Sequence, residues 1–174
     1  VLNAPSWLLV TVEVVAPEDR GDIMGAYKKI FDMVPADTAE RERQLKAAVA
    51  WSVWEGTISN MIPDTADAGK FGEADFALCF AQIEAHFFAN GLFLEPDYIV
   101  RNVDKLKGLD LHIVHGRFDQ VCPLSQASRL VAALEEIGAP PASYVKTDAG
   151  HSAMEGQTVL ALTAIMDGLP KIAS

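Results

Sequence analysis

An aspartate and a histidine in the last third of the chain have the residue types and the sequence setting of a catalytic acid and base. Asp119 follows a strand-like apolar run that ends at Val114, and His151 comes shortly after a second such run. In a nucleophile triad a carboxylate orients the imidazole, and the imidazole takes the proton of the attacking hydroxyl or thiol. The sequence therefore predicts two supporting members of a triad, Asp119 as the acid and His151 as the base.

The nucleophile that this pair would serve is not evident. In α/β-hydrolases the chain order is nucleophile, acid, histidine, and the nucleophile occupies a Gly-x-Ser-x-Gly turn between a strand and a helix. No such turn precedes Asp119, and the chain opens at Val1 without an initiator methionine. The stretch 150–154, Gly-His-Ser-Ala-Met, approaches that pattern, but it ends in Met and no histidine follows Ser152 to act as its base. We therefore expect the nucleophile to lie upstream of Val1, in a missing N-terminal half.

Composition excludes several classes of partner. The 174 residues are 50% hydrophobic and 22% charged, so a buried core is expected rather than disorder. Acidic residues number 24 against 14 basic ones, which gives a net charge of -10. Such a surface repels phosphate groups, and we expect no binding to nucleic acid or to a membrane. The apolar run 7–16 contains Glu13 and is too short to cross a bilayer.

Cysteine and histidine usage gives two further expectations. Cys79 and Cys122 lie far apart in the sequence, which is typical of free thiols in a reducing cytoplasm. His112 and His115 are three residues apart on an expected strand, so their side chains point to opposite faces. We expect a cytoplasmic protein with no metal and no cofactor.

The expected elements change in type near residue 96. Before that point the sequence is helical: Asp37 is placed to begin a helix through the Ala-rich run 45–54, and a second helix is expected over 74–89. Beyond it, strand and helix alternate in four segments: 109–114, 124–137, 142–147 and 158–169. This alternation is typical of a parallel sheet with crossover helices. The predicted fold class is α/β, with a helical cap domain (1–96) followed by the last two strands and helices of an α/β-hydrolase core (97–174).

Two glutamates of the helical part lie among aromatic residues at helical spacing. Glu55 follows Trp51 by one turn, and Glu84 shares a helix face with Phe80, Phe87 and Phe88. A carboxylate buried among rings needs a hydrogen-bonding or cationic partner. Two interpretations follow: each glutamate reaches water at the edge of its apolar stripe, or the two bind an ammonium group whose apolar part is covered by the rings.

Four stretches in this order resemble the C-terminal portion of the proline iminopeptidases, serine peptidases of the α/β-hydrolase fold. They are Trp51 to Gly56, Ala81 to Phe88, Ile113 to Asp119 with Cys122-Pro123, and Asp148 to Glu155. The resemblance spans most of residues 45–160, and the first 45 residues match only loosely. It implies that Asp119 and His151 are the triad acid and base. It also implies that Glu55 and Glu84 hold the substrate's N-terminal imino group.

The same resemblance implies that Phe88 lies against the proline ring and that Cys122 lies near the same pocket. A small buried hydrophobe is the other interpretation of Cys122. His86 and His115 are either polar pocket residues or hydrogen-bonded structural histidines. Residues 85–87 read Ala-His-Phe, where relatives often have Asn-His-Tyr, which leaves the detailed substrate preference open.

The activity implied by the resemblance is release of N-terminal proline from peptides through a serine acyl-enzyme. One alternative is another capped hydrolase acting on esters, epoxides or amides, which would need no paired carboxylates in its cap. A second alternative is a non-catalytic cap fragment. Because two strands alone do not make a stable sheet, we expect the chain to self-associate or to bind the missing N-terminal half, and to be inactive by itself.

Overall fold

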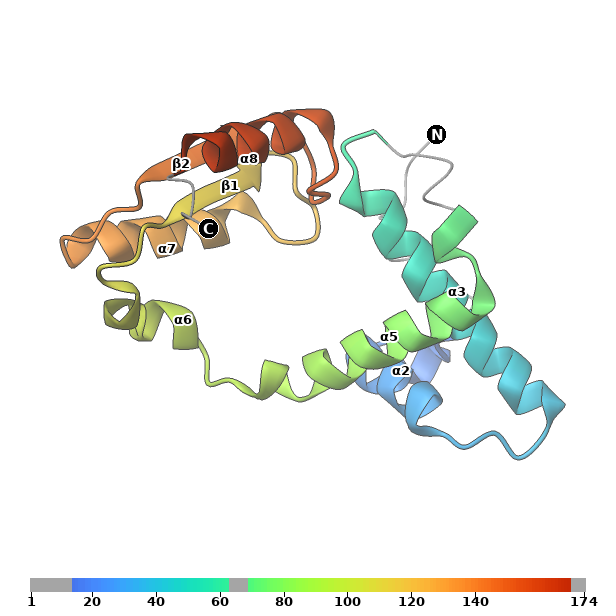
Figure 1. Ribbon diagram of the computed structural model, residues 1–174. Coiled ribbons are helices and arrows are strands. Elements are labelled where there is room, and N and C mark those ends of the chain that lie inside the picture. The colour runs from blue at the N-terminus through green and yellow to red at the C-terminus, as the bar shows by residue number, and fades with distance from the viewer. Residues whose placement is uncertain (1–13, 63–68, 170–174) are drawn as a thin grey trace, which may run out of the picture. The chain divides into compact units, whose positions relative to one another are not determined.

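The structure is a computed structural model that describes residues 14–62 and 69–169, so most of the apolar run 7–16 lies outside the described residues. The described residues form two compact units, which can be followed in Figure 1. The first comprises residues 14–57 and 69–96, and the second comprises residues 58–62 and 97–169. The assignment of these units as a cap and a hydrolase core stays a prediction.

The first unit is built from helices. Their bounds are η1 (Pro17–Asp19), α2 (Ile23–Asp32), α3 (Thr38–Ser59), α5 (Ala74–Ala89) and η2 (Gly91–Phe93), with the last residues of α3 belonging to the second unit. The predicted helix start at Asp37 is confirmed, since Asp37 Oδ1 accepts a hydrogen bond from the backbone N of Glu40 at 2.9 Å. Glu40 in turn accepts one from the backbone N of Ala36 at 2.7 Å. The first bond satisfies an N–H group that the first turn of a helix leaves without a partner, and the second restrains the chain just before the helix.

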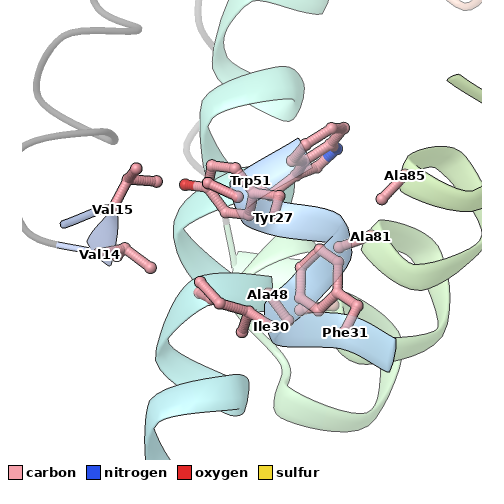
Figure 2. Packing of buried hydrophobic residues seen from close by; sticks show 12 residues of the cluster. Val14, Val15, Tyr27, Ile30, Phe31, Ala48, Trp51, Ala81 and Ala85 are labelled. Carbon is pink, nitrogen blue, oxygen red and sulfur yellow. The ribbon is translucent and has the colours of Figure 1, made fainter. Parts of the chain in front are cut away.

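The core of the first unit combines aromatic rings with small alanine side chains (Figure 2). The rings of Tyr27 and Trp51 meet edge to face, with centroids 5.0 Å apart. Alanines of α3 and α5 that are at most 1% exposed let the neighbouring backbones approach closely: Ala47, Ala48, Ala77, Ala81 and Ala85. Burying one large apolar side chain contributes about 1.5–3 kcal/mol, so this cluster fixes the positions of the helices that carry it.

A buried glutamine joins α3 to the end of α2. Gln44 is 2% exposed, and its Nε2 donates to the carbonyl oxygens of Ile30, Phe31 and Met33 at 3.1, 3.3 and 3.1 Å. Carbonyl groups in the last turn of a helix have no partner within that helix. Gln44, together with Gln82, whose Nε2 donates to Phe31 O at 3.3 Å, therefore supplies hydrogen bonds that the end of α2 needs.

The second unit contains a parallel pair of strands with helices packed on it (Figure 1). Its elements are α6 (Tyr98–Arg101), η3 (Val103–Leu106), β1 (His112–Gly116), α7 (Leu124–Glu136), β2 (Ser143–Thr147) and α8 (Gly156–Gly168). His112 pairs with Ser143 and Gly116 with Thr147, and α7 makes the crossover between the strands. The predicted alternation of strand and helix is confirmed, and the chain is a helix-rich α/β protein with a small parallel sheet.

Membrane-spanning potential in the described ranges is confined to one broken pair of helices. No single helix there is long and apolar enough to span a bilayer, whereas Ala74–Ala89 together with Gly91–Arg101, bent by 70°, passes on length and composition alone.

Candidate active site

The predicted acid, Asp119, lies in the turn that follows β1 and is 7% exposed. Its Oδ1 accepts hydrogen bonds from the backbone N of Val121 at 2.9 Å and of Cys122 at 2.7 Å. Two backbone donors on one oxygen hold the carboxylate in place and compensate for its loss of water. The second oxygen, Oδ2, is left for the imidazole.

The predicted base, His151, meets this second oxygen. Its Nδ1 lies 3.0 Å from Asp119 Oδ2, and because a carboxylate can only accept, the ring donates its Nδ1–H. Nε2 is then the nitrogen with the free lone pair, on a side chain that is 38% exposed. An oriented imidazole with an accessible Nε2 is the arrangement that a general base requires.

The parallel pairing explains why residues 32 positions apart meet. Both strands end at the same edge of the sheet, so the loops that follow them are neighbours. Arg117 N donates to Thr147 O at 2.8 Å, and Phe118 N donates to Ala149 O at 3.0 Å. These two bonds continue the ladder past the strands. They bring the loop that carries Asp119 (residues 117–123, the acid loop) against the loop that carries His151 (residues 148–155, the histidine loop).

A second imidazole, that of His115, lies close to the carboxylate of Asp119. Its Nε2 lies 2.9 Å from the carbonyl oxygen of Cys122 and 3.6 Å from Asp119 Oδ2. Since a carbonyl oxygen accepts, Nε2 carries the proton and donates to it. His115 therefore closes the turn that presents the carboxylate, which agrees with a hydrogen-bonded structural histidine.

In the first unit, the two predicted glutamates form a pair. Glu55 on α3 is only 9% exposed and shares a hydrogen bond with Glu84 on α5. Burial, then this hydrogen bond and the charge of Glu84, raise the pKa of Glu55 to about 8. A carboxyl group with this pKa is largely protonated near neutral pH, so the shared proton is on Glu55 and is hydrogen-bonded to Glu84. The interpretation in which each glutamate simply reaches water is wrong for Glu55.

Aromatic rings border the glutamate pair. Trp51 Nε1 donates to Glu84 Oε2 at 2.8 Å, and Phe88 stacks on Trp51 with centroids 6.3 Å apart and planes at 26°. Phe88 is 43% exposed, so it presents an apolar surface to solvent beside the carboxylates. The first unit thus combines two acceptors with a flat apolar surface.

The remaining aromatic residues that share the helical spacing of Glu84 have other partners. Phe80 stacks on Phe76 at 5.6 Å, and Phe87 meets Phe93 edge to face at the same centroid distance. Helical spacing places residues on one face, but neighbouring elements decide which rings meet. Of the three predicted phenylalanines, Phe88 is the one that packs on the tryptophan bonded to Glu84.

The Cys122 thiol is exposed, so the interpretation of Cys122 as a buried hydrophobe is wrong. The backbone N of Cys122 donates to Asp119 Oδ1, and its carbonyl oxygen accepts from His115 Nε2.

Ser152 lies between β2 and α8, where its Oγ accepts from Met154 N at 3.3 Å. Within residues 14–62 and 69–169, no group of three or more His, Cys, Asp or Glu side chains is arranged to hold a metal ion.

The structure therefore brings the predicted residues together as two pairs, Asp119 with His151 in the second unit and Glu55 with Glu84 in the first. Sequence reasoning missed Glu155, whose carboxylate accepts from the backbone N of Gly150 and of Met61. The signal available in the sequence was an acidic residue four positions after the predicted base His151.

An acid–histidine pair and a pair of carboxylates occur together in a chain that is similar to curated peptidase sequences. The probable proline iminopeptidase of Leptolyngbya boryana is 39% identical over 157 residues, covering 90% of this chain and 46% of the relative. The proline iminopeptidase of Xanthomonas citri is also 39% identical, over 160 residues, with 90% and 48% covered. The chain is a homologue of the proline iminopeptidases.

This homology extends beyond bacteria. The proline iminopeptidase of Arabidopsis thaliana is 33% identical over 145 residues, which cover 82% of this chain and 36% of that relative. No family model matches the chain. The chain spans about half the length of the curated proline iminopeptidases it matches. The resemblance derived from the sequence motifs is confirmed.

Proposed function

We propose that this chain supplies the acid, the base and the imino-group site of a serine peptidase that releases N-terminal proline from peptides. The observation that carries the proposal is the presence of both pairs in one homologue of the proline iminopeptidases: Asp119 Oδ2 lies 3.0 Å from His151 Nδ1, and Glu55 is hydrogen-bonded to Glu84. An esterase or epoxide hydrolase would use the first pair but has no need of the second.

In this proposal, His151 Nε2 takes the proton of a serine hydroxyl as that oxygen attacks the scissile carbonyl carbon. Asp119 stabilises the resulting imidazolium through the Nδ1–H bond. The imidazolium then gives its proton to the departing amine as the carbon–nitrogen bond breaks, which leaves an acyl-enzyme. Water, deprotonated by the same nitrogen, hydrolyses the ester and returns the serine.

Glu55 and Glu84 would hold the substrate's N-terminus. A protonated N-terminal proline is a secondary ammonium with two N–H donors, and two carboxylates supply two charged acceptors. The free pair shares a proton, so binding the cation displaces that proton, and affinity for the cationic substrate rises with pH toward about 8. Phe88, stacked on Trp51, offers an apolar surface for the ring.

The nucleophile and the oxyanion donors of the proposed enzyme lie outside these 174 residues. No Gly-x-Ser-x-Gly turn precedes Asp119, and the chain spans about half the length of its relatives. The 174-residue chain alone should therefore hydrolyse no proline amide and react with no fluorophosphonate probe. Stoichiometric labelling at Ser152 would contradict this assignment of the nucleophile.

The decisive experiment compares two substrates in the full-length protein that contains these residues. Prolyl p-nitroanilide carries the cationic imino group, and N-acetylprolyl p-nitroanilide lacks it. Glu84→Gln should lower kcat/KM for the first roughly ten- to a hundredfold, the cost of a weakened charge-assisted hydrogen bond, and barely change it for the second.

Glu42→Gln is the matched control, because Glu42 is exposed on α3, the helix that carries Glu55. It should leave both rates unchanged. Equal losses on the two substrates in Glu84→Gln would mean that the carboxylate pair is structural, and hydrolysis of neither substrate by the parent protein would reject the function.

A further inference from the structure

Three hydrogen bonds join the histidine loop to the segment at the end of α3, and a fourth lies within the loop, all in the second unit. The carbonyl oxygen of Ser59 accepts from the backbone N of His151 at 2.7 Å and of Ser152 at 2.8 Å. The carboxylate of Glu155 accepts from the backbone N of Met61 at 3.1 Å through Oε2, and from that of Gly150 through Oε1. Three consecutive N–H groups, on either side of and including the proposed base, are thus held by two acceptors.

Both acceptors lie at the ends of helices, and both bond to N–H groups outside those helices. The carbonyl of Ser59 lies in the last turn of α3, where a helix leaves its carbonyl groups without partners, and here the histidine loop provides the donors. Glu155 is the N-cap residue of α8, yet its side chain forms no hydrogen bond to that helix. It turns back to the loop instead, while its negative charge remains favourably placed at a helix N-terminus.

Gly150, the residue before the proposed base, has no room for a side chain. A Cβ atom built on Gly150 would lie 2.8 Å from both Met61 N and Ser59 O, and 2.9 Å from Glu155 Oε1. Such separations are closer than non-bonded atoms tolerate, so the position takes glycine. The backbone at Gly150 is therefore set directly by the two acceptors and by Met61.

We infer that Glu155 is a positioning residue for His151, and that together with the Ser59 carbonyl it fixes the backbone from which the imidazole reaches Asp119. This inference rests on the proposed role of His151 as the general base. The 3.0 Å bond to Asp119 restrains one ring nitrogen only, and a side chain pivots about its own backbone. Displacement of a catalytic group by about 1 Å can cost about a hundredfold in rate, so anchoring the backbone on both sides of the base matters for chemistry.

The test uses Glu155→Ala and Glu155→Gln in the full-length protein, with Glu136→Ala as the control because Glu136 is an exposed acid in α7 of the same unit. Glu155→Ala should lower kcat on prolyl p-nitroanilide roughly ten- to a hundredfold and change KM less than about twofold, since the imino-group site is untouched. Glu155→Gln keeps one acceptor oxygen and should recover part of the loss. Glu136→Ala should match the parent.

A second readout does not depend on peptidase activity. The imidazole Nδ1 proton bonded to Asp119 gives a far-downfield proton NMR signal, and the amides of Gly150, His151 and Ser152 should exchange slowly. In the 174-residue chain and in the full-length protein, Glu155→Ala should broaden the signal and accelerate all three amides. Loss of these signatures in a protein that cleaves no prolyl substrate would reject the proposed function and keep the positioning role.

Two results would overturn the inference. One is a Glu155→Ala variant with unchanged kcat, Nδ1 signal and amide exchange. The other is failure of both Glu155 variants to fold, which would mean that this carboxylate supports the unit as a whole rather than the histidine loop.

Discussion

The carbonyl oxygen of Gly150 occupies the space that a side chain on Gly116 would need: a Cβ atom on Gly116 would lie 1.9 Å from it. Gly116 is the last residue of β1, and Gly150 directly precedes His151. The close approach of these two backbones is what allows the acid loop and the histidine loop to be hydrogen-bonded neighbours. The absence of a side chain on Gly116 thus allows the two loops to lie this close together.

Replacing Gly116 with alanine should therefore separate Asp119 from His151. The clash is with backbone atoms, which cannot rotate away, and we expect a loss of about 1–3 kcal/mol in the free energy of unfolding together with loss of the downfield imidazole signal. Urea denaturation and proton NMR measure the two effects. Gly168→Ala is the control, since nothing lies within 4 Å of a Cβ atom at that position of the same unit. An unaltered Nδ1 signal in Gly116→Ala would contradict the prediction.

The glutamate pair should make stability depend on pH. The folded state raises the pKa of Glu55 from 4.5 to about 8, so between these values the folded chain binds more protons than the unfolded chain. The stabilising contribution is then fully present below about pH 4.5 and is lost as the pH rises through about 8. Thermal melts from pH 4 to 9 should show a decline in Tm that Glu55→Gln flattens and Glu42→Gln retains. A Glu55→Gln variant with the parent's full pH dependence would place the titrating group elsewhere.

Removing the buried amide of Gln44 should destabilise the first unit. Gln44→Met conserves approximate size but leaves the carbonyl groups of Ile30 and Met33 without this donor, whereas Phe31 O keeps the bond from Gln82 Nε2; we expect a loss of about 1–3 kcal/mol. Glu42→Met, an exposed substitution on the same helix, should change stability by less than about 0.5 kcal/mol. Equal denaturation midpoints for the two variants would show that these three bonds contribute nothing net.

Removal of the Ser52 hydroxyl, unlike removal of the Gln44 amide, is not expected to lower the stability of the protein. Its hydroxyl is fully buried and has no hydrogen-bond partner among the described residues. An unpaired buried polar group costs about 1–3 kcal/mol, so Ser52→Ala should leave stability unchanged or raise it by up to about that amount. Differential scanning calorimetry of the parent and the variant measures this directly. A drop in Tm would mean that the hydroxyl has a partner outside the described residues or a bound water.

Local patterns in the sequence predicted much of the secondary structure, because the determinants are close along the chain. Asp37 and Glu40 cap α3 over four residues, and the alternation after residue 96 gives β1, α7, β2 and α8. The acid and base could be placed together because parallel strands end at one edge of a sheet. The predicted strand 109–114 was early by two or three residues, since β1 runs from His112 to Gly116.

The contacts that sequence reasoning missed depend on how the chain folds back and on how elements pack, not on local spacing. Glu155 reaches Met61, which is 94 residues away, and no spacing rule connects them. His115 contacts the carbonyl of Cys122 only because the intervening turn folds back. Helical spacing likewise could not tell that Phe88, rather than Phe80, would pack on Trp51, since the choice depends on how α3 and α5 meet.

The hydrogen bond from Trp51 to Glu84 makes this indole an optical reporter of the carboxylate pair. Indole emission responds to nearby charge, and here the ring's only N–H is bonded to one member of a pair that shares a proton. Ionisation of the pair, or arrival of a cation between the carboxylates, should therefore change the fluorescence. Trp7 and Trp54 also emit, so a Trp51→Phe variant isolates the signal. Proton uptake and ligand binding at the glutamates can then be followed in unlabelled protein, without any chemical turnover.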